Sequence, residues 1–340
     1  MSTNGIVTNS VKKEKAEKRP PKLYTLRAAS DHFEKNSRSR NVDCGRGITR
    51  TLAWNVDGTK LAAGSQDGYL LVGGVDSGFR VHSNFQSTNH GDEVHSISFH
   101  PKLPNIVASA SGNKSINLWD VRVTKAASTL NTKTGNLFCT WSPCGNYLAY
   151  TGKDDRVRIL DTRTFTDLDL VYSSKLQIWD VAFDSTGELL FVAAATGKIN
   201  ILKSQDLKLL QSRQAHSTGS NCMSFAMSRD GNQLACGASD ALISLWNVDD
   251  MSCERCIGRF DWPVRSVSFT HDGRMLAGAS EDHHIDIAWT DTAERVYELK
   301  HDAETFCVTW HPTNYVLAYS GAEQSGGREK PFIKVFGLHS

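Results

Sequence analysis

The apolar and polar residues of this chain recur in a block of about forty-two residues. Each block holds an apolar run that ends at an aromatic residue, a turn marked by Pro or Gly, a run of small residues, and a run in which apolar and polar residues alternate. Alternation with period two predicts strand rather than helix. The aromatic residues of the seven blocks are Trp54, Phe99, Trp141, Phe183, Phe225, Phe269 and Trp310.

The size of the block predicts the architecture. Asn113 and Asp155 stand between the small-residue run and the alternating run, where such residues favour a tight hairpin. Four short strands with tight connections occupy about forty residues, so one block has room for one four-stranded blade and almost none for helix. Seven blocks therefore predict an all-β fold, a seven-bladed β-propeller.

The repeat also predicts the domain organisation. We expect a short disordered basic tail at residues 1–22 and a single propeller domain at residues 23–340. The last repeat ends after its third strand, so the outer closing strand is expected from residues at about 38–44. The repeats are placed at about residues 45–85, 90–130, 132–173, 175–213, 216–257, 261–300 and 302–340.

Charge is distributed unevenly along the sequence. Residues 1–22 carry a net charge of +4 and residues 23–50 carry +3, whereas the whole protein is +1, so the remainder is about −6. A slightly acidic propeller is unsuited to broad nucleic-acid binding. The basic first fifty residues are therefore the candidate segment for a direct contact with RNA, which we expect to be weak. The basic tail is either a nuclear-import signal or a solvated tail. Without a long apolar run or a secretory signal, the protein is expected in the cytosol or nucleus, without a membrane partner and with reduced cysteines.

Two of the alternating runs end in Leu-Trp-Asp or Leu-Trp-Asn and resemble the signature of the WD-repeat family. In that family a loop His, a strand Ser, a turn Asp and the Trp form a structural hydrogen-bonded set within a blade. The second repeat matches this set with Asn in place of Asp, and the fifth matches it with Cys236 where Ser is expected. The resemblance therefore implies a structural role for His90, Ser109, Asn113, Trp119, His216, Asp240 and Trp246.

Other segments narrow the resemblance to the THO subunit 3 family of WD-repeat proteins. They are DWPVR (261–265), the following SVSFTHDGRMLAGASEDHHIDIA, SDALISLWNVDD (239–250) and SGNKSINLWDVR (111–122), and the similarity runs from about residue 38 to 338. It implies a non-catalytic scaffold subunit of the nuclear THO complex, within the transcription–export complex that couples transcription to mRNA packaging, processing and nuclear export. The implied partners are the other THO subunits and, through the complex, a DEAD-box export helicase and an mRNA-export adaptor.

A peptide reader, such as a histone-tail or degron receptor, is the alternative function. It would need a clustered acidic or basic pocket at the channel mouth. We expect no enzyme, because the sequence has no phosphate-binding, zinc-protease or nucleophile-elbow motif, and we expect no cofactor, metal site or small-molecule substrate.

Two segments contain residue types that commonly bind metals, but their sequence context favours other interpretations. Cys253 and Cys256 form a CxxC pair without a second ligand pair, which favours two ordinary thiols on an outer strand. The Glu281–Asp286 segment is rich in ligand types but occupies a tight turn and the strand after it, which favours a solvated or partner-facing turn.

The loop before the sixth aromatic run supplies the candidate partner contacts. Asp261, Trp262 and Arg265 surround a proline there, and an apolar ring in an exposed loop is typical of a contact residue. The alternative is that Trp262 packs beneath its own loop.

Overall fold

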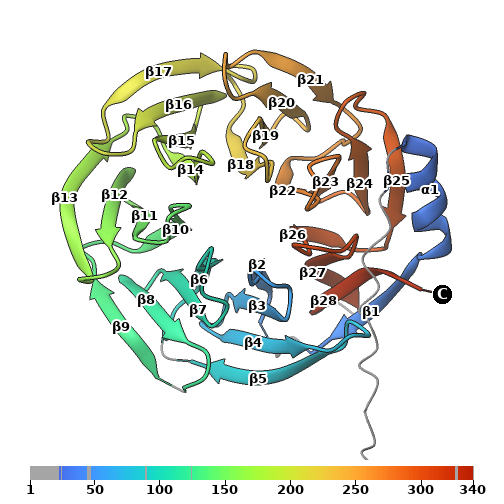
Figure 1. Cartoon of the computed structure of the whole chain (residues 1–340), viewed down its shortest axis with the longest axis horizontal. Helices are drawn as coiled ribbons and strands as arrows, with labels where there is room; N and C mark the ends of the chain where they lie inside the picture. Colours follow the sequence, from blue (N-terminus) through green and yellow to red (C-terminus); the bar gives the residue numbers. More distant parts are fainter. Residues whose placement is uncertain are drawn as a thin grey trace, which may run out of the picture.

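The protein forms a ring of seven four-stranded antiparallel sheets around a central channel (Figure 1). This computed structural model describes residues 23, 25–43, 47–88, 90–123, 125–325 and 328–339. The predicted seven-bladed all-β propeller is confirmed. The predicted tail at residues 1–22 lies outside the described residues.

Blades are numbered 1 to 7 along the sequence, and strands run from the channel to the rim in sequence order in blades 1 to 6. The strands of blades 1 to 3 are β2 (Thr49–Trp54), β3 (Lys60–Ser65), β4 (Leu70–Val75), β5 (Val81–Ser87); β6 (Val94–Phe99), β7 (Ile106–Ser111), β8 (Ser115–Asp120), β9 (Ala126–Asn131); and β10 (Asn136–Trp141), β11 (Tyr147–Gly152), β12 (Arg156–Asp161), β13 (Thr166–Ser173). Those of blades 4 to 6 are β14 (Ile178–Phe183), β15 (Leu189–Ala194), β16 (Lys198–Lys203), β17 (Leu209–Gln214); β18 (Cys222–Met227), β19 (Gln233–Ala238), β20 (Ile243–Asn247), β21 (Cys253–Ile257); and β22 (Val264–Phe269), β23 (Met275–Ser280), β24 (His284–Trp289), β25 (Arg295–Lys300).

The seventh blade joins the first and last strands of the described residues. It contains β26 (Glu304–Trp310), β27 (Leu317–Ser325) and β28 (Arg328–Leu338), and its outer strand is β1 (Arg38–Val42). β1 pairs antiparallel with β28, from Arg38 opposite Leu338 to Val42 opposite Ile333. The backbone hydrogen bonds of this pair close the ring (Figure 1).

Neighbouring blades are held together by the aromatic residues at the ends of the inner strands. The indole nitrogen of Trp54 in blade 1 donates to the Thr309 carbonyl of blade 7 at 3.2 Å. The indole of Trp141 in blade 3 donates to the Ser98 carbonyl of blade 2 at 2.9 Å. The second strands, which are rich in Ala, Gly and Ser, are almost entirely buried and let adjacent sheets approach closely.

Every innermost strand contains a β-bulge at its second or third residue. The pairing with the second strand skips one residue there in all seven blades. A bulge leaves its residue outside the ladder and redirects the side chain. The bulged residues are Arg50, His95, Leu137, Trp179, Met223, Arg265 and Phe306.

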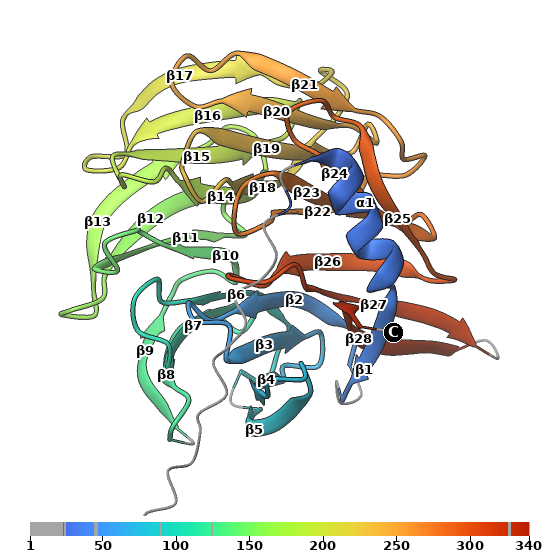
Figure 2. The same cartoon turned by 45° about the vertical axis from the view of Figure 1, so that its right-hand side comes forward.

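Within the described residues, a helix that the sequence pattern does not predict precedes the ring. α1 (Leu26–Lys35) begins at Thr25, whose hydroxyl accepts from the Ala28 amide at 3.2 Å, and it lies against the rim at blades 6 and 7 (Figure 2). Its Phe33 is buried and its Ser30 hydroxyl donates to the Val296 carbonyl of β25 at 2.9 Å. Within the described part of the protein, no helix is long and apolar enough to span a membrane.

Candidate functional site

The two ends of the channel and one loop between blades are the candidate binding surfaces. We call the end at which the inner strands begin the upper mouth and the end at which they finish the lower mouth. The inner strands run in the same direction in every blade, so residues at equivalent strand positions collect at the same mouth. The side chains at each mouth therefore belong to several blades.

The upper mouth holds a cavity of about 400 Å³. Five of its lining side chains belong to bulged residues of the inner strands, which explains why they turn into the channel. The lining consists of Arg50, Phe138, Trp179, Met223, Arg265, Glu281 and Phe306. This set could not be predicted from the sequence, because a bulge depends on the pairing of strands, which a single sequence does not display.

Opposite charges are paired at the upper mouth. Arg50 lies over the Phe306 ring, 4.8 Å from its centroid, and its Nε is 3.4 Å from a carboxylate oxygen of Glu93. The Nε of Arg265 donates to Glu281 at 2.8 Å. Among the described residues, the guanidinium groups of Arg50 and Arg265 thus each lie beside a carboxylate at this mouth.

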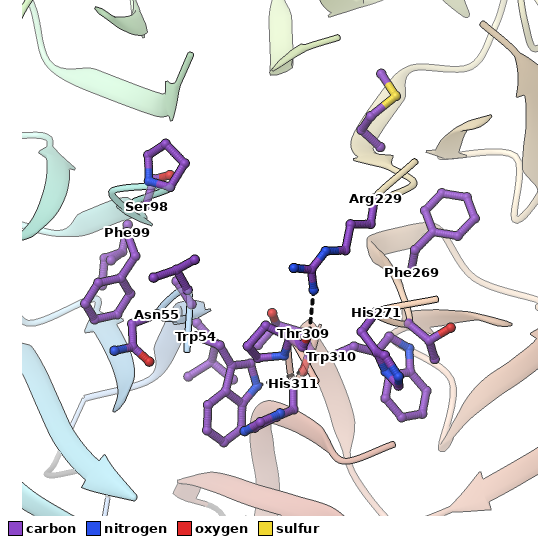
Figure 3. Close-up of a pocket in the computed structure, with 18 of the residues that line it drawn as sticks. Trp54, Asn55, Ser98, Phe99, Arg229, Phe269, His271, Thr309, Trp310 and His311 are labelled. Carbon is purple, nitrogen blue, oxygen red and sulfur yellow. Dashed lines mark hydrogen bonds between the residues drawn. The ribbon is translucent and has the colours of Figure 1, made fainter. Parts of the chain in front are cut away.

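The lower mouth holds a cavity of about 470 Å³ (Figure 3). It lies among the ends of β2, β6, β18, β22 and β26 and the turns that follow them. The Arg229 side chain reaches from a turn of blade 5 toward blade 7, where its Nη1 donates to the Pro312 carbonyl at 2.7 Å (Figure 3). Arg229 was not among the predicted contact residues, because nothing in its local sequence distinguishes it from a solvated turn residue.

Three histidines also line the lower mouth. Burial lowers the pKa of His100 and of His271, and it lowers that of His311 to about 4. All three rings are therefore neutral at physiological pH. Among its described lining residues, the mouth thus combines one guanidinium group, neutral imidazole rings and other polar groups with apolar side chains.

The loop between β21 and β22 carries the predicted contact residues. The carboxylate of Asp282 accepts hydrogen bonds from the Asp261 amide at 3.0 Å and the Trp262 amide at 3.2 Å, which holds this loop to the neighbouring hairpin. The Trp262 side chain remains 56% exposed, so the alternative that it packs beneath its own loop is wrong. Arg265 faces Glu281 at the upper mouth. Contact of Asp261, Trp262 and Arg265 with a partner stays a prediction.

The four residues of the second-blade WD set lie together. Ser109 is the centre, because its hydroxyl is 2.6 Å from His90 Nε2 and accepts from the Trp119 indole nitrogen at 2.7 Å. The side-chain amide of Asn113 donates to the His90 carbonyl. Burial lowers the pKa of His90 to about 4, so the ring is neutral and can accept one hydrogen bond while donating another.

The fifth blade builds the same set with a different serine. His216 Nδ1 is 3.0 Å from Asp240, and its Nε2 is 2.9 Å from the hydroxyl of Ser244, which accepts from the Trp246 indole nitrogen at 2.8 Å. Ser244 lies directly opposite Cys236 across the β19–β20 pair. In this blade the hydroxyl that bonds the Trp indole is therefore on β20 rather than at position 236 on β19. The residue at position 236 alone does not indicate this.

The two segments rich in potential metal ligands lie in different parts of the fold, one on an outer strand and one beside two arginines. Cys253 and Cys256 are exposed on the outer strand β21, and desolvation raises the pKa of both thiols. Asp286 is only 1% exposed, and its oxygens lie 2.6 Å from Arg259 and 2.8 Å from Arg295. The expected solvated or partner-facing position is thus wrong for Asp286, whose buried carboxylate pairs with two partly exposed arginines. Among the described residues, no three His, Cys, Asp or Glu side chains are placed to hold a metal ion.

Comparison with known proteins identifies the repeat type and the fold. The model of the WD domain, G-beta repeat, matches residues 82–120, 207–247 and 253–287. The first match begins in β5 of blade 1 and continues through β6, β7 and β8 of blade 2, so one sequence repeat links two blades. The β-propeller domain in the crystal structure of Cps50 (Swd1) from Myceliophteria thermophila superposes with a TM-score of 0.77 at 17% identity, covering 88% of this protein and 100% of that one.

Two relatives extend the similarity over most of the sequence. WD repeat-containing protein AAC3 of Dictyostelium discoideum is 30% identical over 313 residues, which span 85% of this protein and 65% of that one. THO complex subunit 3 of Arabidopsis thaliana is 32% identical over 309 residues, which span 90% of this protein and 97% of that one. The protein therefore belongs to the THO complex subunit 3 family of WD-repeat scaffold proteins.

Proposed function

We propose that this protein is a non-catalytic scaffold subunit of a nuclear THO complex that couples transcription to mRNA packaging, processing and nuclear export. The observation that carries the proposal is the 32% identity to THO complex subunit 3, because it spans 90% of this protein and 97% of that relative. A closed ring suits a scaffold, since its strands fix a frame from which many loops can each contact a different subunit. The proposed partners are the other THO subunits and, through them, a DEAD-box export helicase and an mRNA-export adaptor.

Affinity purification from nuclease-treated nuclear extract tests this function. Nuclease treatment removes co-purification that depends only on shared RNA. We expect the tagged full-length protein to retain the other THO subunits and the helicase. Retention of a histone tail or a degron-bearing protein without any THO subunit would support the peptide reader instead.

We propose further that Asp261, Trp262 and Arg265 contact another subunit. The support is the 56% exposed indole of Trp262 on a loop held by two hydrogen bonds to Asp282. A rigid exposed aromatic loses little conformational entropy on binding, which favours a hot-spot role worth about 2 kcal/mol or more.

The double variant Asp261→Lys, Trp262→Ala tests the contact. We expect it to lose co-purification of THO subunits while its melting temperature stays within about 2 °C of the wild type, because exposed substitutions change stability by about 0.5 kcal/mol or less. Tyr69→Ala is the matched control, since Tyr69 is a 40% exposed aromatic in a blade 1 turn. Unchanged co-purification by the double variant would remove this loop from the interface.

Weak RNA contact through the first fifty residues is the remaining part of the proposal. A phosphate-dependent interaction weakens steeply with salt. Binding of the full-length and tail-deleted proteins to single-stranded RNA should therefore differ at low salt and converge at high salt. Equal binding of the two proteins at both salt concentrations would refute the contact.

A further inference from the structure

The groove between blades 3 and 4 holds a cavity of about 390 Å³ that reaches the outer strand β13. Glu188 is the one Lys, Arg, Asp or Glu among the described residues that line it. The large apolar side chains of the lining are those of Tyr147, Ile159, Leu168, Leu170 and Phe183. This volume is near the lower end of the range of about 300 to 1,000 Å³ that is usual for ligand pockets, so the cavity suits one or two apolar side chains.

The outer strands beside this cavity expose apolar side chains. Nine large apolar side chains are exposed among the described residues, and four of them lie on β13 and β17, namely Leu168, Val171, Leu209 and Leu210. Leu209 lies opposite Leu202, which packs in the core between blades 3 and 4. Residues opposite each other share a face of the sheet, so Leu209 faces the same groove as Leu168. A cluster of exposed apolar side chains is typical of a docking surface.

The groove between blades 6 and 7 is built in the same way. The residues opposite one another on the first three strands of blade 7 are Trp310, Leu317 and Phe336. The same three positions of blade 4 hold Phe183, Leu190 and Leu202. Strand register therefore places equivalent walls in the two grooves.

The helix α1 shows which element fits such a groove. The centroid of its Phe33 ring lies 5.9 Å from that of Trp310 and 5.7 Å from that of Phe336. Ala29, one turn earlier, is also buried, and a small residue there lets the helix backbone approach the blades. α1 is the only helix of the described residues, and it lies on the opposite side of the ring from β13 (Figure 1).

The groove between blades 3 and 4 is only partly filled by this protein itself. Leu207, from the turn between β16 and β17, is buried in the same core as Phe183. The cavity persists despite this side chain, and Leu168 at its wall remains 38% exposed. An apolar side chain from outside the ring would therefore bury further apolar surface here.

We propose that the groove between blades 3 and 4 binds an amphipathic helix of another protein, which places a Phe or a side chain of similar size against Leu168, Leu170 and Phe183. The helix carries a small residue four positions before this anchor, as α1 does with Ala29 and Phe33. Residues 1–22 of this protein are a poor occupant, because they contain no Leu, Phe, Trp or Tyr. The proposed contact does not assume membership of a THO complex, since the groove is complete within this protein.

Fluorescence anisotropy with the full-length protein tests the contact. The probe is a fluorescein-labelled, amidated peptide, EKALRAASEKFEKALK, which has the Leu, Ala and Phe spacing of Leu26, Ala29 and Phe33 and Glu–Lys pairs that favour helix. The comparison peptide has Ala in place of Phe and the same charge. We expect the Phe peptide to bind at least about tenfold more tightly, because an aromatic anchor carries much of the binding free energy.

Two substitutions on one strand assign the binding to this groove. Leu168→Asp places a carboxylate at the wall of the cavity and should reduce binding of the Phe peptide to the level of the Ala peptide. Val171→Asp is the matched control, because Val171 is 47% exposed on β13 but its neighbour Tyr172 faces the groove, so alternation turns Val171 to the other face. We expect less than about a twofold change in this control.

The thiol of Cys144 reports the position of the bound peptide. Cys144 is exposed and lines the cavity, whereas Cys253 and Cys256 are exposed on β21 of blade 5. At about 90% occupancy by the Phe peptide, alkylation of Cys144 by N-ethylmaleimide should slow about tenfold, because only the free protein reacts. Mass spectrometry of the digested protein should show unchanged alkylation rates for Cys253 and Cys256.

Several outcomes would overturn the proposal. They are equal binding of the two peptides, absence of binding at about 1 mM protein, an equal loss in Leu168→Asp and Val171→Asp, and unchanged alkylation of Cys144. Dimerisation that Leu168→Asp abolishes in analytical ultracentrifugation would assign the groove to a second copy instead. Tighter peptide binding after deletion of residues 1–22 would assign it to the N-terminal segment. The melting temperature of each variant is the folding control, and Leu168→Ala, with an expected loss of about threefold or more, replaces Leu168→Asp if that variant fails to fold.

Discussion

Replacement of Phe33 by alanine should destabilise the ring, although Phe33 lies outside the seven repeats. Its ring is fully buried between two blades. The centroid of this ring lies 6.0 Å from that of Tyr297 in blade 6, 5.9 Å from that of Trp310 in blade 7 and 5.7 Å from that of Phe336. The side chain thus fills the wedge that opens toward the rim where blades 6 and 7 diverge.

The magnitude follows from cavity formation. A buried Phe→Ala change costs about 3 to 5 kcal/mol in free energy of unfolding. At about 2.1 cal/mol/K per residue, the unfolding entropy of 340 residues is about 0.7 kcal/mol/K, so a loss of about 4 kcal/mol lowers the melting temperature by about 6 °C.

Calorimetry of the full-length protein measures the effect. Glu34→Ala is the matched control, because Glu34 is the next residue of α1 and is exposed, and we expect its melting temperature to stay within about 1 °C of the wild type. Equal melting temperatures for Phe33→Ala and Glu34→Ala would show that α1 does not stabilise the ring.

Three further predictions concern stability. Deletion of residues 1–45 removes β1 and α1 and should lower the melting temperature sharply, whereas deletion of residues 1–22 should not; equal values in a thermal melt would contradict the ring-closing role of β1. Ser244→Ala leaves the Trp246 indole nitrogen without its acceptor and should lower the free energy of unfolding by about 1 to 3 kcal/mol in chemical denaturation. An unchanged free energy of unfolding would show that this hydrogen bond does not stabilise the blade. Because burial lowers the pKa of His90 to about 4, the unfolded state binds more protons between pH 6.5 and 4, so stability should fall as the pH drops through this window; an equal pH slope in His90→Gln would refute that assignment.

The repeat made the ring predictable from the sequence. Strand alternation, tight-turn residues and aromatic spacing are local signals, and each block has them, so the number of blades did not depend on any single repeat. α1 has no such signal, because Ala29 and Phe33 are its two buried side chains and the helix is stabilised by blades that lie far away in the sequence.

The candidate sites were less predictable, because they depend on pairing and on contacts between blades. The exposure of Trp262 follows from the hydrogen bonds of its loop to Asp282 in the next hairpin. The role of Ser244 follows from its register opposite Cys236. The position of the Arg229 side chain at the lower mouth depends on its hydrogen bond to blade 7, which lies far from blade 5 in the sequence. These relations depend on strand register and on contacts in three dimensions, which the pattern of apolar and polar residues does not display.

Size-exclusion fractionation of nuclease-treated nuclear extract, with mass spectrometry of each fraction, tests the central claim most directly. A THO scaffold subunit should elute far above the 37.5 kDa of this protein, in the same fractions as the other THO subunits and the DEAD-box helicase. Elution as a 37.5 kDa monomer, or in a large assembly without any THO subunit, would contradict the proposed function.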